Sequence, residues 1–306
     1  MGRTVAILLG TYNGEQHLAR QLDSYAAQTH ADWEVWASDD GSGDATCAIL
    51  ESYRQQWPAG RLSLLRGPEA GFAANFLALS CHDAIQADYY AYSDQDDIWE
   101  ADKLERALRW LENVPAGTPA LYCARTMMVD AADHEIGLSP YYPEACFANA
   151  LVQNIAGGNT MVFNDAARAL LKQAGPRLGI VYHDWWAYLA VSGCGGTVYC
   201  DPVPALRYRQ HGANLVGVDF SWSGRAERLR KLWQGRQKEW NSANIAALRT
   251  LESRLTPENL DRLNLFSNAR ERGLIPRLID FGRSGIYRQS RIGNISLMIA
   301  AIFGKI

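Results

Sequence analysis

The chain of 306 residues is 48% hydrophobic and 21% charged, a composition that supports a large buried core and excludes wholesale disorder. Its net charge of -3 provides no overall attraction for nucleic acid, so we expect no nucleic-acid partner. The charge is unevenly distributed, because residues 1–220 carry 14 basic and 26 acidic side chains whereas residues 221–306 carry 16 and 7. An acidic body followed by a basic tail predicts that the two parts meet different partners.

The six cysteines are dispersed and form no CxxC pair, which predicts reduced core residues rather than a zinc site or disulfides. The apolar run at the N-terminus is too short for a signal peptide and predicts a buried first strand. No segment offers the roughly 18 apolar residues that a membrane-spanning helix needs. We therefore expect a cytoplasmic protein.

The first third of the chain alternates predicted strands with predicted helices. Short β-rich runs predict four strands, at residues 5–9, 33–37, 62–65 and 89–92. Between them we expect three helices, over about residues 16–28, 45–56 and 73–85, the first capped by Asn13 and Gln16. This alternation predicts an α/β fold with a mostly parallel sheet and helices on both faces. In such sheets ligands bind beyond the carboxyl ends of the strands.

From residue 121 to about residue 208 the pattern is irregular and predicts short strands that shape one side of a site. Beyond residue 224 the chain is helical in character, with apolar residues at helix-face spacing: Leu229, Leu232 and Trp233, then Leu248, Leu251 and Leu255. The last stretch combines an apolar run, 295–303, with basic side chains at Arg288, Arg291 and Lys305. We expect two parts, an α/β domain over residues 1–220 and a basic helical extension over residues 221–306.

Three carboxylates in four residues, Asp94, Asp96 and Asp97, follow the predicted strand at 89–92. Such a group is self-repelling unless a cation lies among its members. Mg²⁺ and Mn²⁺ take oxygen ligands and bridge phosphates, so a bound metal-diphosphate is one interpretation. The alternative is an acidic cap on a helix that begins near Glu100.

Two further polar segments follow predicted strands. In Ser38-Asp39-Asp40-Gly41-Ser42 a carboxylate can accept hydrogen bonds from a base or a ribose, or it can form an Asx turn that leads into a helix. In Thr11-Tyr12-Asn13 the tyrosine ring can stack on a nucleobase, or the segment can be a helix cap with a packed tyrosine.

Together, these motifs and the strand–helix order around them resemble family 2 of the glycosyltransferases, which have the GT-A fold; the resemblance covers about residues 4–215. It implies that the nucleotide-sugar is held by residues that follow the first, second and fourth predicted strands and by the Gly-x-x-x-Asn loop after the third strand. Those residues are Thr11, Tyr12, Asn13, Glu15, Asp40, Gly71, Asn75 and Asp94. The family's Asp-x-Asp motif corresponds to Asp94-Gln95-Asp96, which implies that Asp96 coordinates the metal and that Asp94 contacts ribose or a water ligand of the metal.

The resemblance also assigns roles in the second half of the domain. It implies that Asp184 is the catalytic base, since a base must reach the acceptor hydroxyl opposite the leaving diphosphate. The neighbouring indoles favour a raised pKa for that carboxyl group, whereas the alternative is a helix cap with the tryptophans in the core. Gly157-Gly158-Asn159 corresponds to the small-residue turn beside the sugar pocket, an ordinary tight turn being the alternative. The acceptor and sugar pocket is then formed by Gly158, Asn159, His183, Trp185 and Trp186.

The segment Arg207–Asn214 is similar to the Tyr-Arg-x-His segment of the bacterial rhamnosyltransferase-like branch. This implies that Arg209 pairs with phosphate oxygens and that His211 ligates the metal or the diphosphate. The same similarity favours dTDP-L-rhamnose as the donor, with UDP-hexoses open. The implied acceptor is a hydroxyl of a cell-surface glycan such as lipopolysaccharide or O-antigen, either free or lipid-linked. The implied location is the inner face of the bacterial membrane.

The basic, partly apolar tail suits peripheral contact with an anionic membrane leaflet; a solvated helix pair packed on the catalytic domain is the alternative.

Three other classes of protein are alternatives to a glycosyltransferase. A sugar nucleotidyltransferase needs a basic, Gly-rich loop after the first strand, and 10–14 contains no Arg or Lys. A dinucleotide dehydrogenase needs G-x-G-x-x-G at that place, which is absent. A non-catalytic binding module would not need both a metal site and a catalytic base, and the motifs of this sequence suggest both.

Overall fold

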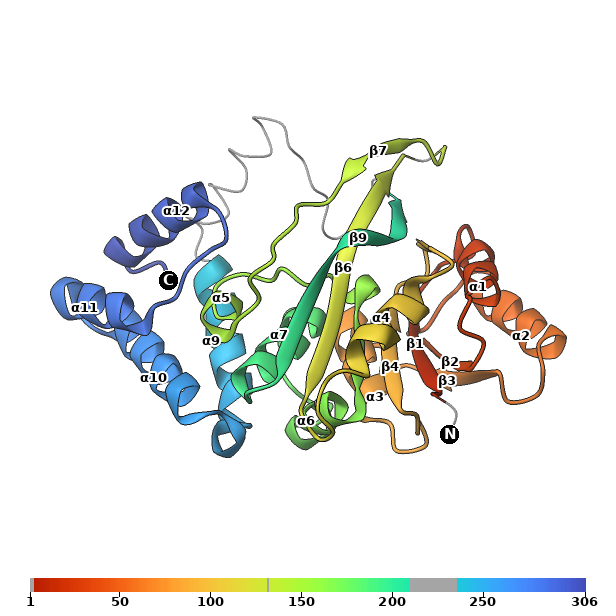
Figure 1. Ribbon diagram of the computed structural model, residues 1–306, viewed down its shortest axis with the longest axis horizontal. Coiled ribbons are helices and arrows are strands. Elements are labelled where there is room, and N and C mark those ends of the chain that lie inside the picture. The colour runs from red at the N-terminus through yellow and green to blue at the C-terminus, as the bar shows by residue number, and fades with distance from the viewer. Residues whose placement is uncertain (1–2, 131, 210–235) are drawn as a thin grey trace.

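The computed structural model describes residues 3–130, 132–209 and 236–306 (Figure 1). Within these ranges, nine strands form a single sheet. They are β1 (Val5–Thr11), β2 (Trp33–Asp39), β3 (Leu62–Arg66), β4 (Tyr89–Ser93), β5 (Ile98–Trp99), β6 (Ala120–Val129), β7 (Glu135–Leu138), β8 (Val162–Asn164) and β9 (Thr197–Arg209).

The helices of the α/β part lie between these strands, and four more are described in residues 236–306. The first group is α1 (Leu18–Ala26), α2 (Thr46–Gln56), α3 (Phe72–Cys81), α4 (Lys103–Leu111), α5 (Phe147–Ala150), the 3₁₀ turn η1 (Gly158–Thr160), α6 (Asp165–Ala174) and α7 (His183–Gly193). The second group is α9 (Arg236–Arg249), the 3₁₀ turn η2 (Glu252–Arg254), α10 (Pro257–Glu271), α11 (Leu274–Ser284) and α12 (Arg291–Ile302).

The sheet has the order β3-β2-β1-β4-β8-β6-β9-β5, and β7 pairs with β6. β1, β2, β3 and β4 are parallel, β8 is antiparallel to both of its neighbours, and β6 and β9 are again parallel. The carboxyl ends of β1, β2, β4, β6 and β9 therefore lie along one edge of the sheet. The predicted mixed α/β architecture with a mainly parallel sheet is confirmed, and this edge is where a ligand site belongs.

Helices cover both faces of the sheet (Figure 1). β1 is buried on both sides: Ala6 and Leu8 join one core cluster, whereas Val5, Ile7 and Leu9 join the other. The second cluster holds buried side chains of α1, α2 and α4, and the first holds those of α3, α5, α6 and α7. The near-continuous apolar run of β1 follows from this double burial.

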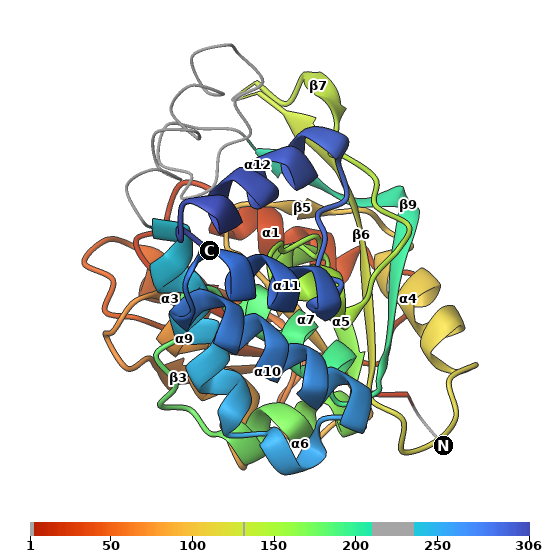
Figure 2. The same cartoon turned by 90° about the vertical axis from the view of Figure 1, so that its left-hand side faces the viewer.

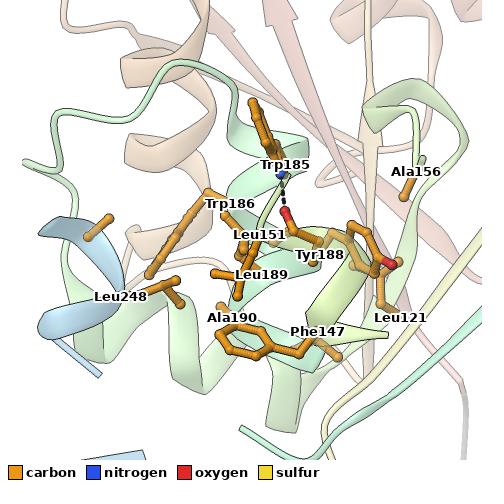
Figure 3. Close-up of a cluster of buried hydrophobic side chains, with 14 of the residues drawn as sticks. Leu121, Phe147, Leu151, Ala156, Trp185, Trp186, Tyr188, Leu189, Ala190 and Leu248 are labelled. Carbon is orange, nitrogen blue, oxygen red and sulfur yellow. Dashed lines mark hydrogen bonds between the residues drawn. The ribbon is translucent and has the colours of Figure 1, made fainter. Parts of the chain in front are cut away.

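The helices after β9 are packed on the domain by the same core. Figure 3 shows Leu248 of α9 in one cluster with Trp186 of α7 and Phe147 of α5. Leu251 and Leu255 are also buried, as their spacing predicted. Figures 1 and 2 show α10, α11 and α12 stacked at one end of the molecule. The predicted division near residue 220, together with Leu229, Leu232 and Trp233, lies outside the described residues, and no described helix is long and apolar enough to cross a membrane.

Three local predictions are wrong. The segment expected to hold only short strands contains β6 and β9, of ten and thirteen residues, because Pro202 and Pro204 of β9 fall where its pairing with β6 shifts register. The expected capping pair is absent, since α1 begins at Leu18 and Asn13 has a φ of 49°. The cysteines are not all core residues, because Cys47 is exposed.

Candidate active site

One cavity of about 1820 Å³ lies at the carboxyl edge of the sheet. It is larger than the roughly 300–1,000 Å³ of most small-molecule sites, so it has room for two substrates together. Of the predicted site residues that the structure describes, all except Glu15 and Trp186 line it. The three carboxylates Asp40, Asp96 and Asp184, which come from distant parts of the chain, therefore face one space. His211 lies outside the described residues.

At one end of the cavity, which we call the turn end, the loops after β1, β2 and β3 are tied together by carboxylates. Asp39 accepts hydrogen bonds from the Thr11 hydroxyl (3.0 Å) and the Ser42 backbone N–H (2.8 Å). Asp39 also accepts from the Gly41 N–H (3.3 Å), two residues on, which is the Asx turn that the sequence offered as an alternative. The bonds from Ser42 and Thr11 lower the pKa of Asp39 against the opposing effect of burial. Asp39 therefore builds the turn.

Asp40 takes a different part in the turn end. Its Oδ1 accepts from the Glu69 backbone N–H (2.6 Å) and its Oδ2 from the Gly71 backbone N–H (2.9 Å). Asn75, two per cent exposed, accepts from the Ser38 hydroxyl and donates to the Ser38 carbonyl. The side chains of Asp40 and Asn75 thus hold the loop before α3 against β2, at the wall where a nucleotide was predicted.

Tyr12 is the exposed aromatic residue of the turn end, with 58% of its surface accessible. The alternative of a packed tyrosine in a helix cap is thereby excluded. Its backbone is clamped by the Gln95 amide, whose Oε1 accepts from the Tyr12 N–H (2.8 Å) and whose Nε2 donates to the Tyr12 carbonyl (2.9 Å). Gly14 makes room for this clamp, since a Cβ there would lie 2.2 Å from the Gln95 Oε1.

Asn13 and Glu15 both bond to the turn after β2, and of the two only Asn13 also lines the cavity. The Asn13 side chain accepts from the Gly43 N–H (2.9 Å), and Glu15 accepts from the Ala45 N–H (2.9 Å) just before α2. Glu15 therefore satisfies a helix N-terminus. Glu15 does not line the cavity, which differs from the prediction that it contacts the base or the ribose.

A second part of the cavity wall, which we call the acidic end, adjoins the turn end through Gln95. Here carboxylates of the β4–β5 loop lie beside the start of α7. Burial, together with the negative charges of Asp96 and Asp184, raises the pKa of Asp94 to about 7. Burial and the negative charges of Asp96 and Asp94 raise the pKa of Asp97 well above its usual range. The alternative of a helix cap is excluded for Asp96 and Asp97, since β5 intervenes and α4 begins only at Lys103.

A buried network supports the acidic end from below. The Asn159 amide donates to Asp97 (2.7 Å), and the Lys103 ammonium donates to the Asn159 carbonyl (2.5 Å) while lying 3.3 Å from the centre of the Trp99 ring. Lys103 is completely buried, and burial lowers its pKa well below the usual value. Sequence analysis missed Lys103, although its place on the apolar stripe of α4 with Ala107 was a signal.

Asp184 lies in the first turn of α7. The Asp184 Oδ2 accepts from the Gly158 backbone N–H (3.1 Å), and its Oδ1 accepts from the backbone N–H of Trp185, the next residue (2.6 Å). Burial nevertheless raises the pKa of Asp184 to about 6. Gly158 fits tightly here, because a Cβ would lie 2.6 Å from the His183 Nε2. The N-cap residue of α7 is Tyr182, so Asp184 is not the cap.

His183 forms an aromatic wall between the two ends. Its ring stacks on Phe76 at 3.9 Å and meets Tyr92 edge-on at 4.8 Å. Burial lowers the pKa of His183 to about 3, so its ring is neutral at physiological pH. Neither ring nitrogen has a hydrogen-bond partner among the described residues.

Two predicted residues have surroundings other than those expected. Trp186 does not line the cavity: it is fully buried in the core cluster, because α7 is packed on all sides (Figure 3). Trp185 lines the cavity with part of its ring and donates to the Ala150 carbonyl (2.6 Å). Arg209 lies in the cavity wall but is only three per cent exposed and forms an ion pair with Asp133 (2.5 Å).

The fold and the cavity define a class of protein, the GT-A glycosyltransferases, and solved structures of that class are similar to this one. Staphylococcus aureus TarS 1–349 in complex with UDP-GlcNAc has a TM-score of 0.52 at 14% identity, over 94% of this chain and 93% of that one. Mannosyltransferase PcManGT from Pyrobaculum calidifontis, in complex with GDP-Man and Mn²⁺, has a TM-score of 0.52 at 17% identity, over 98% and 85%.

Sequence comparison identifies the family. The sequence model of glycosyl transferase family 2 matches residues 6–170. The dTDP-rhamnosyl transferase RfbG of Shigella flexneri is 30% identical over 233 residues, which are 72% of this chain and 78% of that protein. The chain therefore belongs to glycosyl transferase family 2, is rhamnosyltransferase-like in sequence, and is a glycosyltransferase.

Proposed function

We propose that this glycosyltransferase transfers L-rhamnose from dTDP-L-rhamnose to a hydroxyl of a cell-surface glycan, such as lipopolysaccharide or O-antigen, with inversion at the anomeric carbon. The observation that carries the proposal is the position of Asp184. Its carboxyl group, with a pKa of about 6, lines the same cavity as Asp94, Asp96 and the exposed ring of Tyr12. A base for the acceptor therefore shares one space with groups suited to a nucleotide diphosphate.

A divalent cation, Mn²⁺ or Mg²⁺, fits the acidic end. The pKa of Asp94 is raised first by burial and then by repulsion from Asp96 and Asp184, and a cation would relieve that repulsion. No group of three or more His, Cys, Asp or Glu side chains suited to a metal occurs in the described part of the chain. Mg²⁺ needs no such group, because it is commonly held by one or two carboxylates with water and substrate phosphates. We assign Asp96 and Asp94 to this role, with His211 as a third candidate, and the cation would supply charge stabilisation for the leaving diphosphate.

The reaction needs one proton acceptor. Asp184 takes the proton of the acceptor hydroxyl, whose oxygen forms a bond to the anomeric carbon from the face opposite the nucleotide. The bond from that carbon to the diphosphate breaks, and dTDP leaves with the electron pair. The N–H groups of Gly158 and Trp185 hold the Asp184 carboxylate in one orientation throughout.

At the turn end, Tyr12 offers its ring to the base, and the loops fixed by Thr11, Asn13 and Asp40 form the wall around it. Gly71 and Asn75 belong to the same wall. Arg209 is assigned to the diphosphate, an interaction that competes with its ion pair to Asp133. The acceptor enters beside Gly158, Asn159, His183 and Trp185.

The choice of dTDP-L-rhamnose rests on the similarity to the Shigella relative, a dTDP-rhamnosyl transferase. A UDP-hexose is the second candidate, since TarS 1–349, which shares the fold, is in complex with UDP-GlcNAc. We also propose that residues 1–220 are the catalytic domain, that residues 221–306 are an appended helical extension, and that the enzyme works at the inner face of the cell membrane.

The test is donor competition. Purified enzyme is incubated with Mn²⁺ and dTDP-L-rhamnose, UDP-glucose or UDP-GlcNAc, and release of nucleoside diphosphate is measured with and without a chelator. We expect release from dTDP-L-rhamnose only, and its loss on chelation. Thermal shift with dTDP, UDP and GDP reads binding independently of the acceptor. Preference for UDP in both assays would contradict the rhamnose assignment, and full activity in chelator would contradict the metal.

A further inference from the structure

The last helix of the chain exposes an apolar face. On α12 and at its end, six large hydrophobic side chains are between 41% and 74% exposed. They are Ile292, Ile295, Met298, Ile299, Ile302 and Phe303. The spacing of 292, 295, 299 and 302 places their side chains along one side of the helix, while Leu297, Ala300 and Ala301 on the other side are buried. α12 is therefore mainly apolar, with Arg291, Asn294 and Ser296 as its polar residues, and only one side of it is buried in the fold.

α11 continues the apolar face. Leu274, Ile275 and Ile279 are 49%, 72% and 55% exposed. Figure 2 shows α11 and α12 next to each other on the side that faces the viewer, at the end of the molecule remote from α1 and α2. Nine large apolar side chains exposed on two neighbouring helices are uncommon on a monomer and indicate an interaction surface. We call these nine residues the apolar face.

The charges around the apolar face have one sign. After Asp280, which is buried and paired with Arg272, the chain carries four basic side chains and no acidic one. Arg291 begins α12 and is exposed, Lys305 follows its end, and Arg283 is exposed near the end of α11. Cations at both ends of an apolar helix complement anionic headgroups around a lipid surface.

A second copy of the chain fits this face less well. A two-fold pairing of the apolar faces would bring Arg283, Arg291 and Lys305 toward their counterparts with no acidic side chain of the segment to neutralise them. An anionic bilayer supplies the missing charge. α12 has 12 residues, about 18 Å of helix, which is too short to cross about 30 Å of hydrocarbon. Its geometry suits a helix that lies in the plane of the interface.

The apolar face is also continuous with the cavity. Arg288, Ser290 and Gly293 also line the cavity, and Ile292, next to Gly293, is 74% exposed. One end of the cavity therefore opens where α12 begins. A molecule anchored in a bilayer beneath the apolar face would have its head group at this opening.

We propose that the apolar face of α11 and α12 docks in the interface of an anionic lipid bilayer, and that docking places the open end of the cavity over membrane-anchored acceptors. The docking itself is independent of the proposed function, whereas the placement of the cavity over an acceptor rests on the proposed function.

The docking is tested by vesicle flotation with the full chain and no donor or acceptor. Vesicles contain phosphatidylcholine alone or phosphatidylcholine with phosphatidylglycerol, at low and at high salt. We expect the protein to float with the anionic vesicles and to be released by salt. The variant Ile295→Ser/Ile299→Ser/Phe303→Ser should lower the vesicle-bound fraction at least about tenfold, since three apolar side chains no longer enter the interface.

Matched controls separate docking from general surface effects. Ile136→Ser/Val203→Ser removes two side chains that are 56% and 51% exposed on β7 and β9, and should float like the wild type. Arg283→Gln/Arg291→Gln should lower binding to anionic vesicles by about fivefold per residue, with Arg177→Gln without effect. Unchanged melting temperature and nucleotide binding show that each variant is folded.

The result that overturns the proposal is a wild-type protein that does not float with anionic vesicles, or a triple variant that floats as well as the wild type. The proposal is also overturned if the wild type is a dimer in buffer, the triple variant is a monomer, and neither binds vesicles. That result would assign the apolar face to a second copy of the chain. Because no sugar transfer is measured, these outcomes do not depend on the identity of donor or acceptor.

Discussion

The two ends of the cavity hold their polar side chains in opposite ways. At the turn end, Asp39, Asp40 and Asn75 are satisfied by nearby N–H and hydroxyl groups, and the pKa of Asp39 is lowered. At the acidic end, Asp94 and Asp184 are crowded or buried, and their pKa values are raised to about 7 and about 6. The first end is therefore complete without a ligand, whereas the second stores repulsion that substrate and cation can relieve.

Under the proposed function, this difference separates binding from chemistry. A loop whose carboxylates already accept backbone hydrogen bonds is a fixed wall, which costs a ligand little ordering on binding. A carboxylate with a raised pKa is a stronger base, as general base catalysis requires. Substitutions at the turn end should change KM, and substitutions at the acidic end should change kcat.

The largest effect is expected for Asp184→Asn. Without a proton acceptor for the hydroxyl, kcat should fall by about 10²–10⁴ while donor binding by calorimetry stays unchanged. In the wild type, kcat/KM should rise through about pH 6, the pKa of Asp184, and level off above it because the base must be deprotonated. Asp165→Asn, at the start of α6 and outside the cavity, is the matched control and should keep full activity.

Gly158→Ala should reduce kcat by roughly 10²-fold, since small displacements of a catalytic group have effects of this order. The added Cβ would lie 2.6 Å from His183 Nε2 and 3.1 Å from Asp184 Cβ, so the base must move. Gly179→Ala, where a Cβ meets nothing within 4 Å, controls for the substitution itself. Equal activity of the two variants would show that the position of Asp184 is not critical.

Tyr12→Ala tests the turn end. Loss of a ring that stacks on the base should raise the donor KM by about 5- to 100-fold, because such stacking contributes about 1–3 kcal/mol. The melting temperature should stay constant, since the ring is 58% exposed. Tyr141→Ala, also exposed but outside the cavity, should leave steady-state kinetics unchanged. A fall in kcat at constant KM would contradict the separation of binding from chemistry.

The smallest effect concerns stability. A carboxyl group whose folded pKa is raised binds its proton more tightly in the folded state, so the free energy of unfolding falls as pH rises from about 4 through the folded pKa. The metal-free protein should melt a few degrees lower at about pH 8 than at about pH 5, and Asp94→Asn should reduce this difference. Asp83→Asn removes a carboxylate of lowered pKa paired with Lys172, and should not reduce it.

Much of the nucleotide-facing half could be predicted from sequence because its determinants are local. Strands β1 to β4 begin within a residue of their predicted positions, and the polar clusters lie directly after β1, β2 and β4. Asp39 forms the turn that its neighbours Gly41 and Ser42 predicted. Period and turn chemistry act over a few residues, so a single sequence records them.

Other features depend on partners far apart in the chain. Nothing near Gln95 indicates that its amide clamps the backbone of Tyr12, 83 residues away. Nothing near Asn159 indicates that it joins Asp97 to Lys103 under the acidic end. Trp185 and Trp186 are equivalent in sequence, and only the packing of α7 decides that the first lines the cavity and the second belongs to the core.

The sequence by itself determined the family, the order of the elements and the carboxylates of the site, since these are written in local patterns. Tertiary structure alone decided which carboxylates are satisfied and which are strained by burial, because desolvation depends on everything packed around a group. It also decided that only one side of α12 is buried: the run from 295 to 303 is apolar except for Ser296, and the neighbouring helices select the face that remains exposed.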